Sequence, residues 1–291
     1  MAEVKLLPRE DFRKMQLLEL DMLVELDRVC RAHDIPYVIS CGTMIGAVRH
    51  KGYIPWDDDA DIVMLREDYE RFKTVAGDLN PKICFFQDHD TDPEFLWGYG
   101  KLRRTGTSFV RAGQEHMKGQ TGVFIDMFPL DDLPLSVPGQ MRQVFWCYFL
   151  RKVLWSRVGK VHAKGVKKAW FELLSHIPVK WVYDRLKPIM KRSRNDSPNE
   201  VTGLVTGKWG PPRYKYGLPV SYGMPKSWFL DRAEYEFEGH MLYGTKDYDA
   251  CLKYMYGDYM KLPPEDQRDP HSPVSSYSFD GAYDPEKEGD A

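Results

Sequence analysis

Four aspartates lie within five positions of this 291-residue chain: Asp57, Asp58, Asp59 and Asp61. Carboxylates at this spacing repel one another, so they favour a bound cation or a nearby hydrogen-bond donor. The apolar run that follows predicts a buried strand over 59–65. Because side chains two apart on a strand share a face, Asp59 and Asp61 would lie on one side, about 6–7 Å apart along the backbone. Such oxygen ligands suit one or two Mg²⁺ ions, with Mn²⁺ as an alternative, and Asp57 has the same parity.

A second acidic position supports metal chemistry. Asp126 lies within the apolar run 123–127, which predicts another strand. A carboxylate among Ile, Met and Phe side chains is costly to bury unless an arginine or the metal of Asp59 and Asp61 compensates it. Three carboxylates on two neighbouring strands would form a two-metal site for phosphoryl transfer. A solvated acidic loop is the alternative for the aspartate run, but the apolar strand that follows favours the site.

Residues that could bind phosphate precede the acidic strand. Gly42 and Thr43 follow a predicted strand over 37–40, where glycine lets the backbone approach a phosphate and the threonine hydroxyl can donate a hydrogen bond. Arg49 could bind phosphate oxygens in a bidentate fork. The sequence has no Gly-Lys-Ser/Thr, so this segment is not a Walker A loop.

A basic run downstream supplies further cations. Lys101, Arg103 and Arg104 follow one another closely in a segment with strand character, and each could donate hydrogen bonds to a pyrophosphate. The same run would also suit the solvated face of a hairpin, and the sequence leaves both interpretations open.

The spacing of apolar residues predicts the elements that would position these groups. Helices are expected over 9–33, 44–49 and 68–76, and strands over 37–40, 59–65, 83–87, 95–103, 108–111 and 123–127. The segment 140–194 should be mostly helical with breaks near Pro178 and Pro188, 195–222 should be loop, and the tail from 263 should be irregular. This order suggests an α/β or α+β fold with a helical addition.

Charge is distributed unevenly along the chain. The net charge is only −2, which excludes a globally basic protein that coats nucleic acid. Residues 141–194 nevertheless contain 14 Lys and Arg against two acidic residues, together with four tryptophans. This segment would suit an anionic membrane face or a polyanionic glycan, whereas the simpler interpretation is a helical subdomain with solvated lysines. No nucleic-acid reader motif accompanies the charge, so we expect no nucleic-acid partner.

Targeting signals are absent from the sequence pattern. The first residues contain no apolar signal-peptide core, and the longest unbroken apolar run is seven residues, Val144–Leu150. A spanning helix needs about 20 apolar residues. We therefore expect a cytoplasmic protein, with the inner face of the membrane as a further option through 141–194.

Several of these segments together resemble the LicD family, which includes the fukutin-related proteins. The segments that carry the resemblance are Cys41–Gly52, Ile54–Ile62, Asp68–Tyr69, Ile125–Asp131 and Tyr256–Pro264. They span about three quarters of the chain, and the basic middle segment is the part that matches poorly. The family often has Gly or Ser where Cys41 lies, so the resemblance assigns Cys41 no role as a nucleophile.

The resemblance implies an α+β fold with a nucleotidyltransferase-like mixed-sheet core, a mostly helical basic insertion and a C-terminal region. The expected boundaries are 1–140 for the catalytic core, 141–194 for the helical subdomain and 195–291 for the region that completes the core. By the same resemblance Asp59, Asp61 and Asp126 are catalytic metal ligands, with Asp57 as a further acid.

The implied reaction is Mg²⁺-dependent transfer of a phospho-alcohol, typically phosphocholine, from CDP-choline or another CDP-alcohol. The acceptor would be a hydroxyl of a cell-surface glycan, a lipid-linked glycan or a teichoic-acid precursor. The quaternary ammonium of choline favours an aromatic cage. Candidate aromatic residues are Tyr37, Tyr53, Trp56, Trp97 and Tyr99.

Two other functions are compatible with the same residues. A nucleotidyltransferase that moves NMP from an NTP to a sugar, nucleotide or protein needs the same metals and phosphate-binding turn. An inactive binding module could retain the fold, although buried acids with neither a metal nor a partner would destabilise it.

Overall fold

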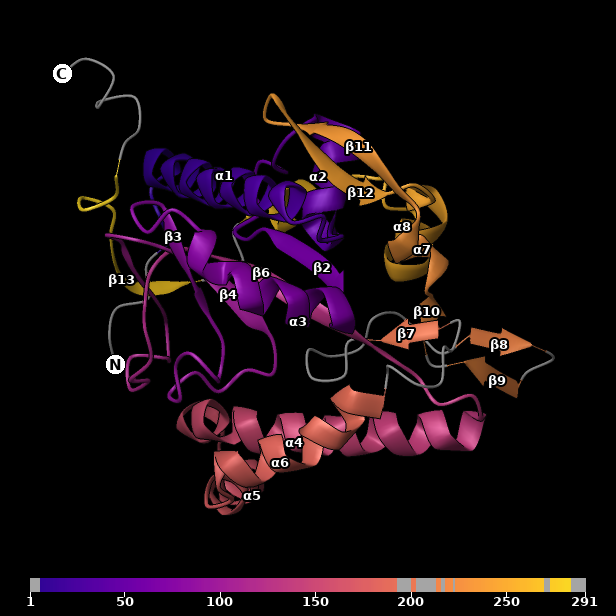
Figure 1. Ribbon diagram of the computed structural model, residues 1–291. Coiled ribbons are helices and arrows are strands. Elements are labelled where there is room, and N and C mark those ends of the chain that lie inside the picture. The colour runs from indigo at the N-terminus through magenta and orange to yellow at the C-terminus, as the bar shows by residue number, and fades with distance from the viewer. Residues whose placement is uncertain are drawn as a thin grey trace.

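The computed structural model describes residues 6–192, 200–202, 213–215, 218–221, 223–269 and 273–283. Within these residues, nine strands form one mixed sheet that is flanked by helices (Figure 1). The mixture of parallel and antiparallel pairs with helices between them confirms the predicted α+β class.

Helices and short strands are both distributed along the chain. The described helices are α1 (Arg9–Ala32), α2 (Cys41–His50), α3 (Arg66–Val75), α4 (Val137–His162), α5 (Gly165–Ser175), α6 (Val179–Arg192), α7 (Ser227–Leu230) and α8 (Tyr248–Tyr256). The described strands are β1 (Val38–Ile39), β2 (Asp61–Leu65), β3 (Cys84–Gln87), β4 (Gly100–Arg104), β5 (Ser108–Arg111), β6 (Phe124–Asp132), β7 (Glu200–Thr202), β8 (Arg213–Lys215), β9 (Leu218–Ser221), β10 (Met224–Pro225), β11 (Arg232–Phe237), β12 (His240–Thr245) and β13 (Val274–Ser278).

The sheet has the strand order β10-β7-β6-β2-β1-β12-β11, and β4 also pairs with β6 and carries β3 on its outer edge. The central pair is β2 and β6, which run parallel with Asp61 opposite Asp126. On its other side β2 pairs antiparallel with β1, and β1 pairs parallel with β12. The two acidic strands predicted from sequence are therefore direct neighbours.

The centre of the sheet is buried on both faces. Ile62 and Met64 of β2 face the main core, which α1 and α3 cover. Val63 and Leu65 face a smaller core that includes residues of α7 and α8. Because side chains alternate along a strand, Asp61 and Asp126 point to this second face. A strand buried on both sides explains the continuous apolar run in the sequence.

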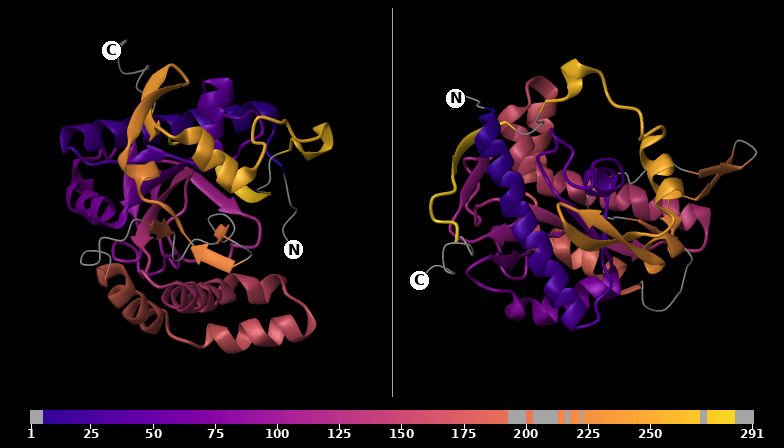
Figure 2. Two further views of the ribbon diagram at one scale, coloured as in Figure 1. Left: turned by 90° about the vertical axis from the view of Figure 1, so that its right-hand side faces the viewer. Right: turned by 90° about the horizontal axis from the view of Figure 1, so that it is seen from above.

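The basic segment forms three helices below the sheet (Figure 1). Helices α4, α5 and α6 share a separate hydrophobic cluster that includes Leu150, Phe171 and Leu186. The left view of Figure 2 again shows these helices on the opposite side of the sheet from α1. Among the described helices, none combines the length and apolar character that crossing a bilayer requires.

The structure differs from several predicted boundaries near the site. Strand β2 begins at Asp61, so Asp59 lies in the loop before it rather than on the strand. Helix α2 begins at Cys41, so Gly42 and Thr43 belong to its first turn rather than to a turn that precedes it. Strand β4 begins at Gly100, and 95–99 are not strand.

Later segments also differ from the predicted elements. Helix α6 continues through Pro188, because its apolar side packs on α4 and α5 and compensates for one missing hydrogen bond. The expected loop 195–222 contains β7, β8 and β9, and its remaining residues lie outside those that the structure describes. The tail forms β13, which pairs antiparallel with β5. Such long-range pairing has no local sequence signal.

A buried ion pair joins α3 to the sheet. The Arg66 guanidinium donates two hydrogen bonds to the Asp131 carboxylate, at 2.7 and 2.9 Å, and both side chains are buried. Removal of one partner leaves the other charge buried and uncompensated, which typically destabilises a protein by about 3–5 kcal/mol.

We therefore expect Asp131→Leu to lower the free energy of unfolding by about 3–5 kcal/mol, and the double variant Arg66→Met/Asp131→Leu to recover most of that loss. Urea denaturation measures both. The control is Asp184→Ala in the exposed pair with Lys180, where solvent screens the charges and the stability should be essentially unchanged. A double variant as unstable as Asp131→Leu would contradict this account.

Candidate functional site

Three carboxylates converge where β2 and β6 lie side by side. Oxygen atoms of Asp59, Asp61 and Asp126 all lie within 4.8 Å of one another, and Asp57, Asp58 and Asp59 form a second such group. The Asp126 N–H donates a 2.9 Å hydrogen bond to the Ala60 carbonyl, which fixes β6 against the residue between Asp59 and Asp61. The convergence that the sequence predicted is present, although Asp59 reaches it from the loop.

These carboxylates line a cavity of about 770 Å³, here called the first cavity. One wall is the N-terminal turn of α2, including Gly42, and Arg49 reaches the cavity from the last turn of the same helix. Another wall is the segment 255–264, the end of α8 and the loop after it. The C-terminal part of the chain thus completes a cavity whose acidic residues come from the N-terminal half.

Helix α2 is fitted closely to the acidic loop. A β-carbon built on Gly42 would overlap the Oδ2 atom of Asp57, so the glycine leaves room for that carboxylate in the orientation it adopts. The Thr43 hydroxyl accepts a 2.8 Å hydrogen bond from the Asp61 N–H and thereby fixes the start of β2. Gly42 and Thr43 therefore position two of the aspartates, beyond the phosphate-binding role that their sequence context predicted.

The acidic loop is also attached to α1. The side-chain amide of Gln16 donates hydrogen bonds to the carbonyls of Ile54 and Asp57, at 3.2 and 3.1 Å. Glu19, one turn further along α1, is buried, and one of its oxygens has no hydrogen-bond partner among the described residues. Burial, followed by the nearby Asp59, raises the pKa of Glu19 well above its usual value, which favours the neutral acid.

Burial and mutual repulsion also disfavour negative charge on the cavity aspartates. Burial, with Asp59 and Asp58 as neighbours, raises the pKa of Asp57 to about 8. Burial and the adjacent carboxylates raise the pKa of Asp59 and of Asp61 in the same direction. Because ionisation of these three aspartates is unfavourable without a cation, a divalent cation that neutralises their charge would stabilise the site.

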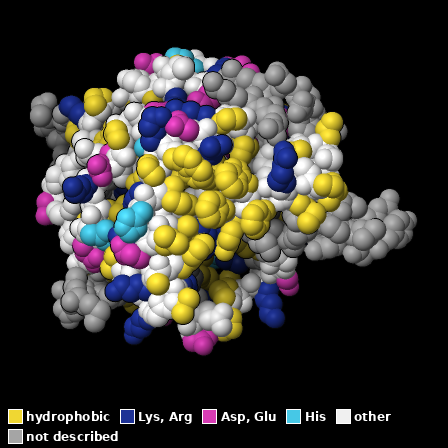
Figure 3. Space-filling model, turned by 90° about the horizontal axis from the view of Figure 1, so that it is seen from below, with side chains coloured by type: hydrophobic (Ala, Val, Ile, Leu, Met, Phe, Trp, Pro, Cys, Tyr) yellow, Lys and Arg dark blue, Asp and Glu magenta, His cyan; other side chains and the backbone are white. Residues whose placement is uncertain are grey.

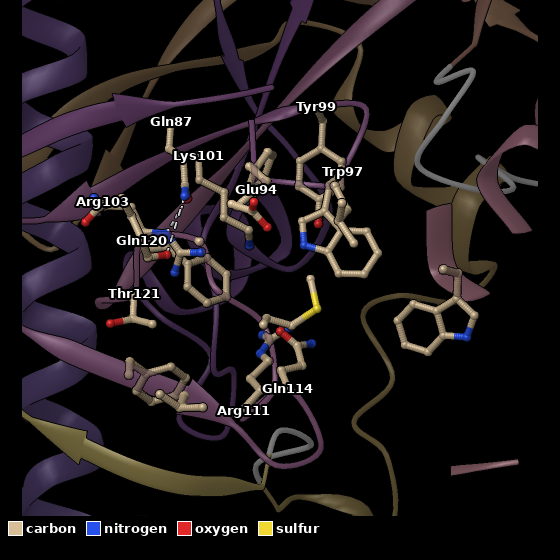
Figure 4. A pocket seen from close by; sticks show the side chains of 18 of the residues that line it. Gln87, Glu94, Trp97, Tyr99, Lys101, Arg103, Arg111, Gln114, Gln120 and Thr121 are labelled. Atoms are coloured by element: carbon tan, nitrogen blue, oxygen red, sulfur yellow. Dashed lines mark hydrogen bonds between the residues drawn. The ribbon is translucent and has the colours of Figure 1, made fainter. Parts of the chain in front are cut away.

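The predicted cations lie at different places. The Arg49 guanidinium donates a 2.9 Å hydrogen bond to the Tyr259 carbonyl and lines the first cavity. The Lys101 ammonium donates to Asp126, and both side chains are buried. Lys101 and Arg103 line a neighbouring cavity of about 480 Å³, here called the second cavity (Figure 4). Arg104 points elsewhere, because it binds Asp21 and the carbonyls of Lys82 and Ile83 in the core.

Sequence reasoning missed two charged residues at the site. Arg111, at the end of β5, lies 3.6 Å from Asp59 and lines the second cavity. Its only signal was a cation at the end of the predicted strand 108–111. Glu19 had a clearer signal, because it occupies a position in the buried three- and four-residue series of α1, among Phe12, Met15, Met22 and Leu26.

Comparison with known proteins assigns the chain to a protein family. A family model described as the nucleotidyltransferase domain of LicD, FKTN and FKRP matches residues 34–157, which contain the three carboxylates and α2. The lipopolysaccharide cholinephosphotransferase LicD of Haemophilus influenzae is 30% identical over 278 residues, which covers 91% of this chain and 97% of that protein. The chain belongs to the LicD family.

Two uncharacterised proteins are similar to shorter parts of the chain. An uncharacterised protein of Rickettsia typhi is 35% identical over 74 residues, 25% of this chain and 23% of the relative. An uncharacterised protein of Rickettsia prowazekii is 40% identical over 55 residues, 19% of this chain and 21% of the relative. The predicted family membership is confirmed by the similarity to the Haemophilus influenzae protein, which extends over most of the chain.

The helices of the basic segment expose apolar side chains. Phe145 of α4 is 72% exposed, and Trp170 and Leu173 of α5 are 50% and 64% exposed. Figure 3, which views the molecule from below, shows hydrophobic side chains gathered on this face with Lys and Arg around them. Of the four tryptophans in the segment, Trp146 and Trp181 pack against the cluster shared by α4–α6, whereas Trp170 lies outside it.

The raised pKa values generate a prediction about metal-free protein. Because the pKa of Asp57 is about 8 in the folded chain and about 3.9 when unfolded, the folded chain retains a proton between these values that the unfolded chain has lost. The resulting stability is complete at low pH and is lost as pH rises through 8, at about 1.4 kcal/mol per pH unit for each such group.

In EDTA, the melting temperature should fall between pH 5 and 7, and Asp57→Asn should flatten this slope. Mg²⁺ at pH 7 should restore much of the loss, because ligand that binds only the folded state stabilises it. Asp184→Asn, on the exposed side of α6, should keep the slope of the unmodified chain. A flat profile in the unmodified chain would contradict the raised pKa values.

Proposed function

We propose that this chain transfers phosphocholine from CDP-choline, or a related phospho-alcohol from another CDP-alcohol, to a hydroxyl of a cell-surface glycan or teichoic-acid precursor. The observation that carries the proposal is the convergence of Asp59, Asp61 and Asp126 in the first cavity beside the N-terminal turn of α2. Carboxylates beside a helix N-terminus suit a metal-bound diphosphate. The activity in the name of the Haemophilus influenzae relative supports choline as the alcohol.

The residues of the first cavity fit a divalent cation. Their clustered, buried carboxylate oxygens are the ligands that Mg²⁺ prefers, with Mn²⁺ as an alternative, and Asp59, Asp61 and Asp126 would hold the ion with Asp57 at its border. When bound, the ion would neutralise charge on the donor diphosphate.

The side chains around the carboxylates have distinct tasks in the transfer. Asp126 accepts the proton of the acceptor hydroxyl, whose oxygen forms a bond to the phosphorus of the donor. The bond from that phosphorus to the bridging oxygen breaks, and CMP leaves with the electron pair. Lys101, which donates to Asp126, holds the carboxylate in place. Arg49, tethered to the Tyr259 carbonyl, donates to the diphosphate.

In this proposal the choline group binds against aromatic residues of the first cavity. Of the five aromatic candidates from the sequence, Tyr37 and Tyr53 are buried in the main core. Trp56 lines the first cavity, and the segment 255–264 adds Tyr256 and Tyr259. Aromatic faces beside acidic residues attract a quaternary ammonium. Trp97 and Tyr99 line the second cavity, where Lys101, Arg103 and Arg111 would repel it.

The reaction is tested by product analysis with Mg²⁺ and CDP-choline, CDP-ethanolamine, CDP-glycerol and CDP-ribitol. We expect slow CMP release from CDP-choline even without acceptor, and at least about 100-fold less from Asp61→Asn and Asp126→Asn, since each removes negative charge that the transfer requires. Asp184→Asn is the matched control and should retain full activity.

The same assay separates the alternatives. Pyrophosphate release from an NTP, with no CMP from any CDP-alcohol, would replace the proposal with nucleotidyl transfer. Absence of both products, with no Mg²⁺-dependent rise in melting temperature, would indicate an inactive binding module.

We also propose that the exposed face of α4 and α5 contacts an anionic membrane, where a lipid-linked acceptor would lie. Apolar side chains such as Trp170 and Leu173 stand among lysines, which suits a negatively charged lipid surface. The charge complementarity of the basic segment supports this partner over a neutral surface.

Flotation with vesicles checks the membrane contact. Anionic vesicles that contain about 30% phosphatidylglycerol should bind the chain, and pure phosphatidylcholine vesicles should not. Trp170→Ser/Leu173→Ser should reduce binding by about tenfold. Leu230→Ser, an equally exposed site on α7, is the control. Equal binding to neutral vesicles, or none to anionic ones, would overturn this proposal.

A further inference from the structure

The second cavity lies on the opposite side of the Asp126–Lys101 ion pair from the first. Asp126 lines the first cavity, and Lys101 lines the second. Its volume of about 480 Å³ is within the range of small-molecule sites. Strand residues of β4 and β5 form one side, and Arg151, Lys152 and Trp155 of α4 border it.

Three cationic groups gather inside this cavity. The Lys101 ammonium and the guanidinium groups of Arg103 and Arg111 lie 3.2, 5.0 and 4.8 Å from the centre of the Phe124 ring. Burial lowers the pKa of Arg103 to about 10; Asp126 opposes this shift, while the neighbouring Arg111 adds to it. Like charges held this close favour an anion between them.

Two carboxylates, Glu94 and Glu115, also line the second cavity, but both residues are exposed, and among the described residues neither forms an ion pair with Arg103 or Arg111. Arg103 donates to the Gln87 side chain and the Gly122 carbonyl, both neutral, and no carboxylate of the described residues lies within 4.0 Å of it. The Nε atom of Arg111 is buried with no hydrogen-bond partner in the described part of the chain. The carboxylates nearest to Arg111 and Lys101 are Asp59 and Asp126, the residues that would hold the metal.

The rest of the lining suits a sugar ring. Trp97 and Tyr99 lie on the side of the cavity away from Arg103, whereas Gln120 lies beside Arg103 and Gln114 beside Arg111 (Figure 4). Aromatic faces pack on apolar ring surfaces, and amides both donate to and accept from hydroxyl groups. Cations with neighbouring amides on one side and aromatic faces on the other suit a ligand that is part sugar and part anion.

We propose that the second cavity is the acceptor site and that it takes a sugar bearing a phosphate group close to the hydroxyl that is attacked. The phosphate would bind Arg103 and Arg111, and the sugar would lie against Trp97 with its hydroxyl toward Asp126. The acceptor role rests on the proposed function. The sequence suggested that Arg103 binds the pyrophosphate of the CDP-alcohol. In this proposal Arg103 binds the phosphate of the acceptor sugar instead.

Calorimetric titration of the full chain, with Mg²⁺ and saturating CMP in the first cavity, tests this site. Glucose 6-phosphate should bind at least tenfold more tightly than glucose. Glucuronic acid, which carries a carboxylate instead, should lie between them. Arg103→Gln should weaken the binding of glucose 6-phosphate at least tenfold without changing that of glucose, and Arg103→Lys should restore part of it.

Further variants keep the test decisive if Arg103→Gln does not fold. Arg151→Gln, at the cavity border, should weaken the phosphate-bearing sugar about threefold, whereas Lys167→Gln on exposed α5 should behave as the unmodified chain. Glucose binding as tightly as glucose 6-phosphate, or glucose 6-phosphate that binds clearly more tightly when CMP is left out of the titration, would overturn the inference. Failure to release CMP from CDP-choline, with Arg103-dependent binding intact, would instead reject the proposed function and leave the phosphate site standing.

Discussion

Repulsion among buried carboxylates is the constraint around which this structure is organised. Asp59, Asp61 and Asp126 meet because β2 and β6 pair in a register that places Asp61 opposite Asp126. The surrounding residues reduce the electrostatic repulsion among these carboxylates in different ways. Lys101 and Arg111 provide positive charge, the first turn of α2 accommodates Asp57, and the raised pKa values show that ionisation is still opposed. A divalent cation would remove the remaining repulsion.

The Asp126–Lys101 pair also divides the site into two chemical environments. The first cavity combines aspartates with aromatic residues of the segment 255–264, and the second combines cations with Trp97 and amides. In the proposed reaction, a cationic alcohol and an anionic acceptor would each meet the complementary cavity, with Asp126, the proposed proton acceptor, between them. This separation gives a physical basis for directing two charged substrates to opposite sides of one reacting bond.

Much of the local structure could be predicted because it depends on short-range patterns. The period of α1, the apolar body of β2 and the strand around Asp126 follow from the alternation of apolar and polar residues, and the α+β class follows from their order. Predictions failed where distant packing decides the outcome. Pro188 remains helical because α6 packs on α4 and α5, and the tail forms β13 because β5 offers a free edge.

The sequence by itself determined which residue types are present for chemistry: clustered aspartates next to a buried strand, a glycine and threonine before them, and membership of the LicD family. Only the tertiary structure decided which of these residues meet. It placed Arg103 in the second cavity and Arg104 in the core, although they are adjacent in sequence, because neighbouring side chains on a strand point to opposite faces. It also added Arg111 and the segment 255–264, whose approach depends on long-range contacts that no local pattern encodes.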